Sequence, residues 1–195
     1  MYIIAFSFIF VFLENMADII IKEVKTKAEL MQFIKFPMAL YHRNDNYVPP
    51  LIGDEKSIWN PKENPALQYS EAKQFLAYKN GKLTGRIAVM INHKEAQELG
   101  TPKVRFGWLD FIDDISVSEA LINEAVQYAR THHIEKIEGP MGFTNLDKAG
   151  MLTMGFDRLA TMIGLYNFPY YPEHLEKLGL KKEKEWVEYE INFPE

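Results

Sequence analysis

The sequence contains no cysteine, which excludes disulfide bonds, thiolate metal sites and a cysteine nucleophile. A chain without cysteine is compatible with a reducing compartment, and we expect a cytoplasmic protein. An excess of positive charge is also missing, because 27 acidic residues against 22 basic ones give a net charge of −5. We therefore expect no nucleic-acid partner. The five histidines show no metal-binding spacing, so no metal is expected either.

The sequence also has no long hydrophobic run. Residues 2–13 are apolar, but they are fewer than the ~20 residues that a membrane-spanning helix needs, so no transmembrane segment is expected. They lack the basic start and the cleavage site of a secretory signal. Met16 stands directly before a stretch typical of the start of a soluble domain. We predict that residues 1–15 are not part of the fold and that residues 16–195 form a single domain. A short membrane-surface anchor is the alternative for residues 2–13.

The first half of the chain carries several local signals. Residues 19–24 are predicted to form a strand, after which Thr26 and Glu29 form the capping box of a helix that Pro37 ends. The Asn80-Gly81 pair predicts a type I′ turn between two antiparallel strands, and residues 103–112 form the next strand. Between these parts lies a long irregular region, residues 41–72, for which we expect short helical turns. Three aromatic side chains are expected to hold this region to the body: Tyr47, Trp59 and Tyr69.

The second half alternates helices and strands. Ser116 and Glu119 predict a second capping box, for a helix that runs to about His132. We then expect a short strand over residues 134–140, a strand over 161–168, a helix from Pro172 to Gly179 and a final strand over 185–191. This order predicts an α+β protein with three layers. Its central sheet is mixed and mostly antiparallel, and helices cover both faces.

A loop rich in glycine, residues 139–157, reads "GPMGFTNLDKAGMLTMGFD". Two interpretations compete. In the first, the backbone N–H groups of Gly142, Phe143, Thr144 and Asn145 donate to a ligand, and the side chains of Asn145 and Asp147 bind a hydroxyl or an amine. In the second, the segment is a capped turn. Asn145 or Asp147 would then cap a short helix through Met151, and Gly155 would end it.

The predicted order, with "YKNGKLTGRIAVMIN" as its second and third strands, resembles the GCN5-related N-acetyltransferase (GNAT) fold of the acyl-CoA N-acyltransferases. Five strings are similar to those of a bacterial group with this fold, in which a second half of similar size often follows. They are "NYVPPLIGDEKSIWNPKENP", "FLAYKNGKLTGRIA", "FGWLDFIDD", "GPMGFTNLDKAGMLTMGFD" and "YNFPYYPEHLEKLGL". The resemblance covers residues 19–191 and implies transfer of an acyl group from acetyl-CoA or another acyl-CoA to an amine.

The resemblance also implies a coenzyme A pyrophosphate loop, Q/R-x-x-G-x-G/A, between the fourth strand and the following helix. Free N–H groups at a helix start bind such an anion. The corresponding segment here reads "DFIDDISVSEA", without glycine, arginine or glutamine. Asp113 and Asp114 stand where the diphosphate would lie, and carboxylates repel an anion. The pyrophosphate motif is therefore absent.

Catalytic residues are also implied by the resemblance. Asp110, at the end of the fourth strand, matches a general base that takes a proton from the amine; the alternative is a carboxylate that caps neighbouring backbone. A tyrosine that protonates the leaving thiolate is implied four residues before Gly179, where this chain has Leu175. Tyr171 is a candidate substitute, or else a packing aromatic. Arg86 is a candidate for binding a ligand anion, although a surface partner for an acidic side chain is its default interpretation.

The leading hypothesis is thus an acyl-CoA N-acyltransferase of unknown substrate. The alternative is a non-catalytic domain of the same fold that binds a small metabolite or a partner domain, or that forms a homodimer through a sheet edge. The candidate residues are Asp110 and Tyr171 for catalysis, Gly142, Phe143, Thr144 and Asn145 for the cofactor, and Asp147, Gly150 and Asn167 for the substrate.

Overall fold

In the computed structural model, residues 19–144, 146–159, 164–189 and 191 are described. Their sheet has five strands in the order β1-β2-β3-β4-β5. The first three pairings are antiparallel, and β4 and β5 are parallel, which confirms the mixed, mostly antiparallel sheet. The bounds are β1 Ile19–Glu23, β2 Ser70–Lys79, β3 Lys82–Asn92, β4 Val104–Phe111 and β5 Ile137–Glu138.

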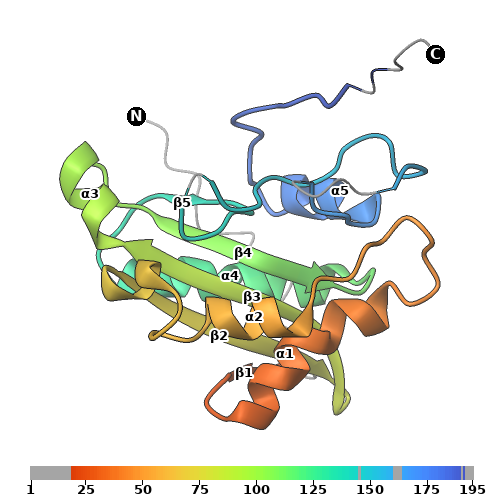
Figure 1. Cartoon of the computed structure of the whole chain (residues 1–195), viewed down its shortest axis with the longest axis horizontal. Coiled ribbons are helices and arrows are strands. Elements are labelled where there is room, and N and C mark those ends of the chain that lie inside the picture. The colour runs from red at the N-terminus through yellow and green to blue at the C-terminus, as the bar shows by residue number, and fades with distance from the viewer. Residues whose placement is uncertain (1–18, 145, 160–163, 190, 192–195) are drawn as a thin grey trace, which may run out of the picture.

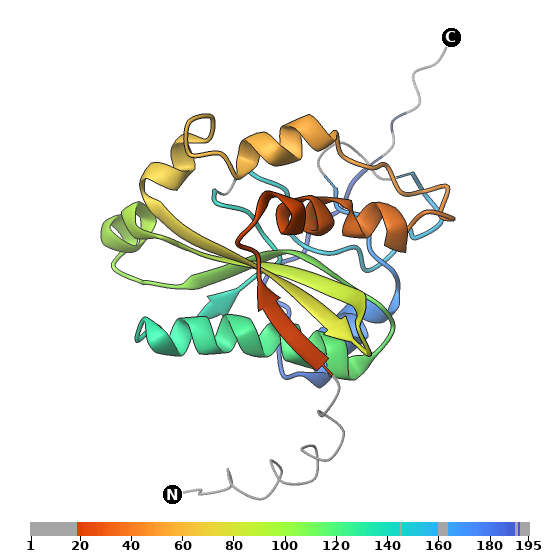
Figure 2. The ribbon, with the colours of Figure 1, turned by 90° about the horizontal axis from the view of Figure 1, so that it is seen from below.

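Helices cover both faces of this sheet, as predicted. Figure 2 shows α1 and α2 on one face and α4 with α5 on the other. The helices are α1 Lys27–Leu40, α2 Ile52–Ile58, the 3-10 helix η1 Pro65–Gln68, α3 His93–Leu99, α4 Ile115–Thr131 and α5 Tyr170–Lys177. The short helices α2 and η1 confirm the helical turns expected within residues 41–72, whereas α3 was not predicted.

The central strand β3 explains why the sheet is buried on both sides. Its side chains alternate between two apolar clusters, as the period of two along a strand requires. Ile87 and Val89 pack with α4 residues, whereas Ala88 and Met90 pack with Phe33 of α1. The strand therefore reads as a nearly continuous apolar run and forms the middle layer of the three.

Helix α1 begins as predicted and ends differently. The capping box is confirmed, since Glu29 N donates to Thr26 Oγ1 at 3.2 Å and Thr26 N to Glu29 Oε2 at 2.9 Å. The prediction that Pro37 ends the helix is wrong, because α1 continues to Leu40 with Pro37 inside it. A proline lacks the N–H that would bond four residues back, which leaves the carbonyl of Phe33 without a helical partner. Arg86 Nη1 donates to that carbonyl oxygen at 2.7 Å.

The structure also tests the predicted hairpin turn at Asn80-Gly81 and the predicted N-cap of α4. The predicted hairpin is confirmed, because Asn80 and Gly81 both have positive φ, 50° and 73°. The predicted cap of α4 is wrong, since Asp114, and not Ser116, is the N-cap: its carboxylate accepts from Ser116 N at 3.1 Å. Asp114 holds the extended backbone conformation that an N-cap needs, with φ −151° and ψ 110°. The helix ends at Thr131 with His132 as its C-cap, which agrees with the expected end at about His132.

The C-terminal part differs most from the prediction. No strand forms over residues 164–168, although the start of that predicted strand lies outside the described residues. Residues 185–189 and 191 are coil rather than the predicted final strand, and the chain leaves the sheet after α5 (Figure 1). Side chains take the place of a strand at the end of β4: Tyr170 OH donates to Phe111 O at 2.6 Å, and Phe111 N donates to Tyr171 OH at 3.0 Å.

Helix α5 itself is confirmed with a shifted start. It begins at Tyr170, so Pro172 lies in its first turn, where a helix needs no N–H from it. Gly179 follows the C-cap residue Leu178 with φ 88°, a conformation that favours glycine. This short helix carries Tyr170 and Tyr171 to the end of β4.

Candidate functional site

A buried ion pair lies where β3 and β4 meet near the end of β4. Asp110 and Arg86 are cross-strand partners, and Arg86 Nε donates to Asp110 Oδ2 at 2.7 Å. Only 8% of Asp110 and 6% of Arg86 are exposed. The expectation of a surface partner for Arg86 is therefore wrong, since its carboxylate partner is an interior one. Arg86 also lies over the ring of Phe33, 4.9 Å from the ring centre.

Two tyrosines extend this pair into a chain of hydrogen bonds. Tyr41 OH donates to Asp110 Oδ1 at 2.9 Å, and the hydroxyls of Tyr41 and Tyr171 lie 2.7 Å apart. The single hydroxyl proton of Tyr41 is donated to Asp110, so Tyr41 can only accept from Tyr171. Tyr171 OH therefore donates to Tyr41 OH, and it accepts a hydrogen bond from Phe111 N. The structure thus brings the two predicted catalytic residues, Asp110 and Tyr171, into one chain that runs through Tyr41.

Tyr41 is the member of this chain that the sequence analysis missed. It directly follows α1 and continues the helix's buried positions Phe33 and Pro37 at intervals of four residues. That spacing is the signal that could have found it, because residues four apart share one helix face. The irregular composition of residues 41–72 hid the signal.

Burial controls the protonation of the two tyrosines. Burial raises the pKa of Tyr41 well above its usual value, and the negative charge of Asp110 raises it further. Burial likewise raises the pKa of Tyr171, with the charge of Asp110 as the next cause. Both hydroxyls therefore keep their protons near neutral pH and serve as donors. Tyr47 lies beside them, with its ring centre 4.6 Å from that of Tyr41, and burial raises the pKa of Tyr47 as well.

The glycine-rich loop folds back on itself and on β4. Met141 N donates to Phe106 O at 2.8 Å, and Gly150 N donates to Pro140 O at 2.7 Å. Asp147 Oδ2 accepts from Thr144 N at 2.7 Å. These contacts hold residues 140–144 and 146–150 in a compact turn. The amides of five of its described residues are bonded within the protein: Met141, Thr144, Leu146, Asp147 and Gly150. The alternative prediction of a short helix through Met151 is wrong, because residues 146–151 contain none.

Phe143 and Gly142 fix this turn to the body. Phe143 is buried, and its ring packs against Trp59 and Trp108 with centres 5.6 and 6.1 Å away. The Phe143 carbonyl accepts from Arg105 Nη1 at 2.7 Å. A Cβ on Gly142 would lie 2.5 Å from the Cβ of Asp147, so only glycine fits there. Of the other loop candidates, Asn145 lies outside the described residues.

The remaining candidates, Gly150 and Asn167, hold neighbouring loops in place. Asn167 is buried, accepts from Leu152 N at 2.6 Å and donates to Leu152 O at 3.1 Å. Gly150 has φ 81°, and a Cβ there would contact the ring of Trp186. Neither residue has a described hydrogen bond to Asp110 or Tyr171, so the structure does not join these candidates to the Asp110 chain.

The start of α4 is occupied by the protein's own carboxylates. Asp114 caps the helix and pairs with Lys79 Nζ at 2.6 Å. Partial burial alone would raise the pKa of Asp114, but hydrogen bonds from Lys79 and Ser116 outweigh it, and the pKa is lowered. Asp113 Oδ1 lies 3.2 Å from His174 Nε2. Since carboxylates repel phosphate groups, these residues do not fit a diphosphate at this helix end.

Within the described ranges, no three histidine, aspartate or glutamate side chains come together as metal ligands would. In the same ranges, no helix has the length and apolar character needed to cross a membrane.

The fold is that of the GNAT acyltransferases. One structure of this class, an aminoglycoside acetyltransferase from an uncultured soil metagenomic sample in complex with trehalose, superposes with a TM-score of 0.50 at 12% identity, over 90% of this chain and 97% of that one. A transcriptional regulator from Bacillus halodurans gives a TM-score of 0.52 at 14% identity, over 89% and 99%. At such low identity the likeness concerns the fold alone, and it confirms the predicted fold class.

Two curated proteins are similar in sequence. Protein YghO of Escherichia coli is 30% identical over 163 residues, which are 84% of this chain and 42% of that protein. The bacterial ceramide synthase of Caulobacter vibrioides is 29% identical over 177 residues, which are 90% of this chain and 46% of that protein. The chain thus spans less than half the length of these relatives. No family model matches the chain.

Proposed function

We propose that this chain takes part in transferring an acyl group from acetyl-CoA or another acyl-CoA to an amine. The observation that carries the proposal is the link from Asp110 through Tyr41 to Tyr171, with contacts of 2.9 and 2.7 Å. The GNAT fold supports it. A further support is the Caulobacter relative, which is named a ceramide synthase; a ceramide is a lipid in which an acyl group is joined to an amine.

The proposed roles follow from proton balance. When an amine attacks a thioester, a C–N bond forms, a C–S bond breaks, the nitrogen loses a proton and the sulfur gains one. In our proposal Asp110 takes the proton from nitrogen and Tyr171 gives one to sulfur. Tyr41, bonded to both, lets a proton gained at Asp110 replace the one that leaves Tyr171. Arg86 holds the carboxylate in position.

The start of α4 takes no part in this proposal, because Asp113 and Asp114 do not fit a diphosphate. The turn of residues 140–150 is the other element proposed to lie near a ligand. Its Asp147 and Thr144 are bonded to each other at 2.7 Å, so they would have to exchange this bond for one with a ligand.

A second candidate function is a non-catalytic domain that binds a small metabolite or a partner. The burial of the Asp110 chain favours it, since both carboxylate oxygens already accept hydrogen bonds, from Tyr41 and Arg86. A partner domain or a second copy would pair with the edge strand β1, where 67% of Ile20 is exposed. We propose a cytoplasmic location for either function.

A turnover assay separates the two candidates. The purified chain is incubated with acyl-CoA donors from acetyl to palmitoyl and with a panel of small and long-chain amines, and amide products are measured by mass spectrometry. Amide formation that rises in proportion to protein concentration supports acyl transfer. Saturable binding of an acyl-CoA by calorimetry without any amide product supports the second candidate and contradicts the first.

A further inference from the structure

Trp108 of β4 has a backbone conformation that a tryptophan rarely adopts. Its φ is 45°, in the left-handed region that is uncommon for residues other than glycine. The pairing of β3 with β4 shifts between Arg86 and Ala88, so that Trp108 and Leu109 together stand opposite one residue of β3 as a β-bulge. Such bulges re-aim a side chain, and residues in strained conformations cluster at binding and catalytic sites. Trp108 is therefore a candidate for a role beyond packing.

The side chain of Trp108 lies on the face of the sheet that carries Asp110. Its ring packs against that of Trp59, with centres 4.7 Å apart, and belongs to the apolar cluster around Phe33. Arg86, the ion-pair partner of Asp110, lies over the ring of the same Phe33. Trp108 and Asp110 thus share the side of β4 that α1 and α2 cover (Figure 2).

The indole of Trp108 holds a carboxylate of α2. Trp108 Nε1 donates to Glu55 Oε2 at 2.9 Å. Among the residues that the structure describes, the Glu55 side chain has no other hydrogen bond and no ion pair, so its second oxygen is left for another donor. Glu55 is partly exposed and can be reached from solvent. Whereas Asp110 is paired with Arg86, the negative charge of Glu55 has no cation beside it.

Tyr47 joins this carboxylate to the Asp110 chain. Its ring centre lies 4.6 Å from that of Tyr41, whose hydroxyl donates to Asp110. Burial raises the pKa of Tyr47, and the negative charge of Asp110 raises it further. Arg86 lowers this pKa and Glu55 raises it, so all three charged groups act on one hydroxyl. In the described part of the chain the Tyr47 hydroxyl has no hydrogen-bond partner of its own.

These groups fit an ammonium ion. A carboxylate accepts strong hydrogen bonds from a charged N–H donor, and aromatic rings such as those of Trp108 and Tyr47 attract a cation. Asp110, Arg86 and Glu55 together carry one net negative charge, which an alkylammonium would neutralise and which would repel an anion. Alkyl amines are cations near neutral pH, as the pKa of about 10.4 for a lysine side chain illustrates.

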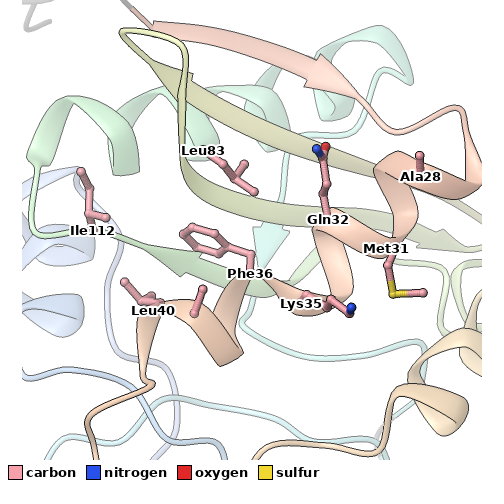
Figure 3. Close-up of a pocket in the computed structure, with 9 residues that line it drawn as sticks. Ala28, Met31, Gln32, Lys35, Phe36, Leu40, Leu83 and Ile112 are labelled. Carbon is pink, nitrogen blue, oxygen red and sulfur yellow. The ribbon is translucent and has the colours of Figure 1, made fainter.

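The apolar groove along α1 does not offer this chemistry. Figure 3 shows it with Phe36, Leu83 and Ile112 among its lining residues. Lys35 is the one charged residue that lines it, and no carboxylate does. An ammonium ion is therefore expected at Glu55 and not in this groove.

We propose that Glu55, together with Trp108 and Tyr47, binds the ammonium group of an alkyl amine on the face of the sheet that carries Asp110. The proposal rests on the proposed function, which it narrows from any amine to one that is a cation at neutral pH. An aromatic amine, which is neutral at this pH, would not be held. The bulge at Trp108 then has a role, because it aims the indole N–H at Glu55 and fixes the carboxylate.

The test measures binding of a cation without turnover. The full chain is titrated at pH 7 with n-butylamine, which is then butylammonium, and with n-butanol as its neutral counterpart. Calorimetry and tryptophan fluorescence follow binding, since two of the three tryptophans, Trp59 and Trp108, lie in this cluster. We expect saturable binding of butylammonium, with butanol weaker by at least about tenfold.

Two variants that remove the same charge separate binding from a general effect of charge. Glu55→Gln keeps an acceptor oxygen for Trp108 Nε1 but loses the charge, and should weaken butylammonium binding by at least about tenfold. Asp54→Asn removes the charge of the neighbouring, exposed carboxylate in the first turn of α2. It should change the affinity by less than about twofold, because exposed charges are screened. Circular dichroism of both variants checks that they fold.

Several results would overturn the proposal: no saturable binding of butylammonium, butanol binding that is equally tight, or equal affinity in the wild type and Glu55→Gln. Equal losses in Glu55→Gln and Asp54→Asn would do so too, because the attraction would then be unspecific. Butylammonium binding that depends on Glu55, without amide formation in the turnover assay, would leave the site assigned and remove the proposed acyl transfer. Amide formation from alkyl amines with the same KM in the wild type and Glu55→Gln would do the reverse.

Discussion

The guanidinium of Arg86 donates a hydrogen bond to the carbonyl oxygen of Phe33 at 2.7 Å, the carbonyl that Pro37 leaves without a partner inside α1. A proline in a helix is usually costly because it removes one hydrogen bond. Here the vacated acceptor is used by a buried cation that also pairs with Asp110. Arg86 therefore connects α1, which Tyr41 directly follows, to the strand that carries Asp110, and so sets the geometry of the proposed site.

Replacing Arg86 should destabilise the protein strongly. In Arg86→Met the carboxylate of Asp110 stays buried without its cation, and such losses cost about 3–5 kcal/mol. Arg130→Met, at an exposed position of α4, is the matched control and should stay within about 0.5 kcal/mol of the wild type. Urea unfolding measures both. A loss for Arg86→Met no larger than that of the control would show that Arg86 contributes little to stability through its contacts with Asp110 and with the Phe33 carbonyl of α1.

Removing one hydroxyl from the hydrogen-bonded chain should also be measurable. Tyr171→Phe leaves the buried amide of Phe111 without an acceptor, which should lower the free energy of unfolding by about 1–3 kcal/mol. Tyr189→Phe removes the same atom from a side chain that is 83% exposed and should have almost no effect. If the two variants unfold at the same urea concentration, the Tyr171 hydroxyl is not engaged as described.

Because the glycine-rich turn packs against β4, we expect alanine substitutions at two glycines to change the stability of the protein in opposite directions. A Cβ at Gly107 would lie 2.3 Å from the carbonyl oxygen of Met141, so Gly107→Ala should push the turn away and destabilise the protein by more than about 1 kcal/mol. At Gly53 in α2 nothing lies within 4 Å of the added atom. Gly53→Ala should therefore be stabilising by about 0.4–1 kcal/mol, because alanine loses less backbone entropy on folding. Thermal unfolding of the pair checks the turn's position, and an unchanged Gly107→Ala would contradict it.

The capping box of α1 predicts an acid-dependent loss of stability. Hydrogen bonds from Lys22, and then from the backbone of Lys25 and the side chain of Thr26, lower the pKa of Glu29 from its ordinary 4.5 to about 2. Since the folded state has the lower pKa, this contribution is complete above pH 4.5 and is lost as the pH falls toward 2. Glu29→Gln should therefore be less stable than the wild type at neutral pH, with a difference that shrinks between pH 4.5 and 2. A difference that is constant with pH would contradict the role of the carboxylate.

The elements predicted best are those defined by neighbouring residues. Asn80-Gly81 and Thr26 with Glu29 fix a turn and a helix start by contacts within four residues, so the sequence suffices. The cap of α4 was misplaced because Asp114 and Ser116 are both good caps, and Ser116 with Glu119 also fits the spacing of a capping box. The prediction of a final strand over residues 185–191 was wrong for a different reason. The end of β4 that could have received a strand bonds the hydroxyls of Tyr170 and Tyr171, and this depends on the whole fold.

In the candidate site, too, contacts between residues far apart in the sequence could not be predicted. Asp110 could be nominated from the resemblance, because it stands at the implied place at the end of its strand. Tyr171 could be nominated only as a substitute, since the implied tyrosine position is occupied by Leu175. Arg86 was assigned to the surface and Tyr41 was overlooked, since their roles depend on partners 24 and 69 residues away from them, respectively. Periodicity could have shown that Tyr41 faces inward, but not that its hydroxyl reaches a carboxylate.

The most direct test of the central claim compares amide formation by the wild type and by Asp110→Asn, with the acyl-CoA and the amine that give product in the turnover assay as substrates. An amide side chain keeps the size and one acceptor oxygen but cannot take up the amine proton. We predict a rate at least about 100-fold lower, the usual contribution of a general base, with the folded fraction verified for both proteins. A rate for Asp110→Asn within about threefold of the wild type would contradict the assignment of Asp110 as the proton acceptor.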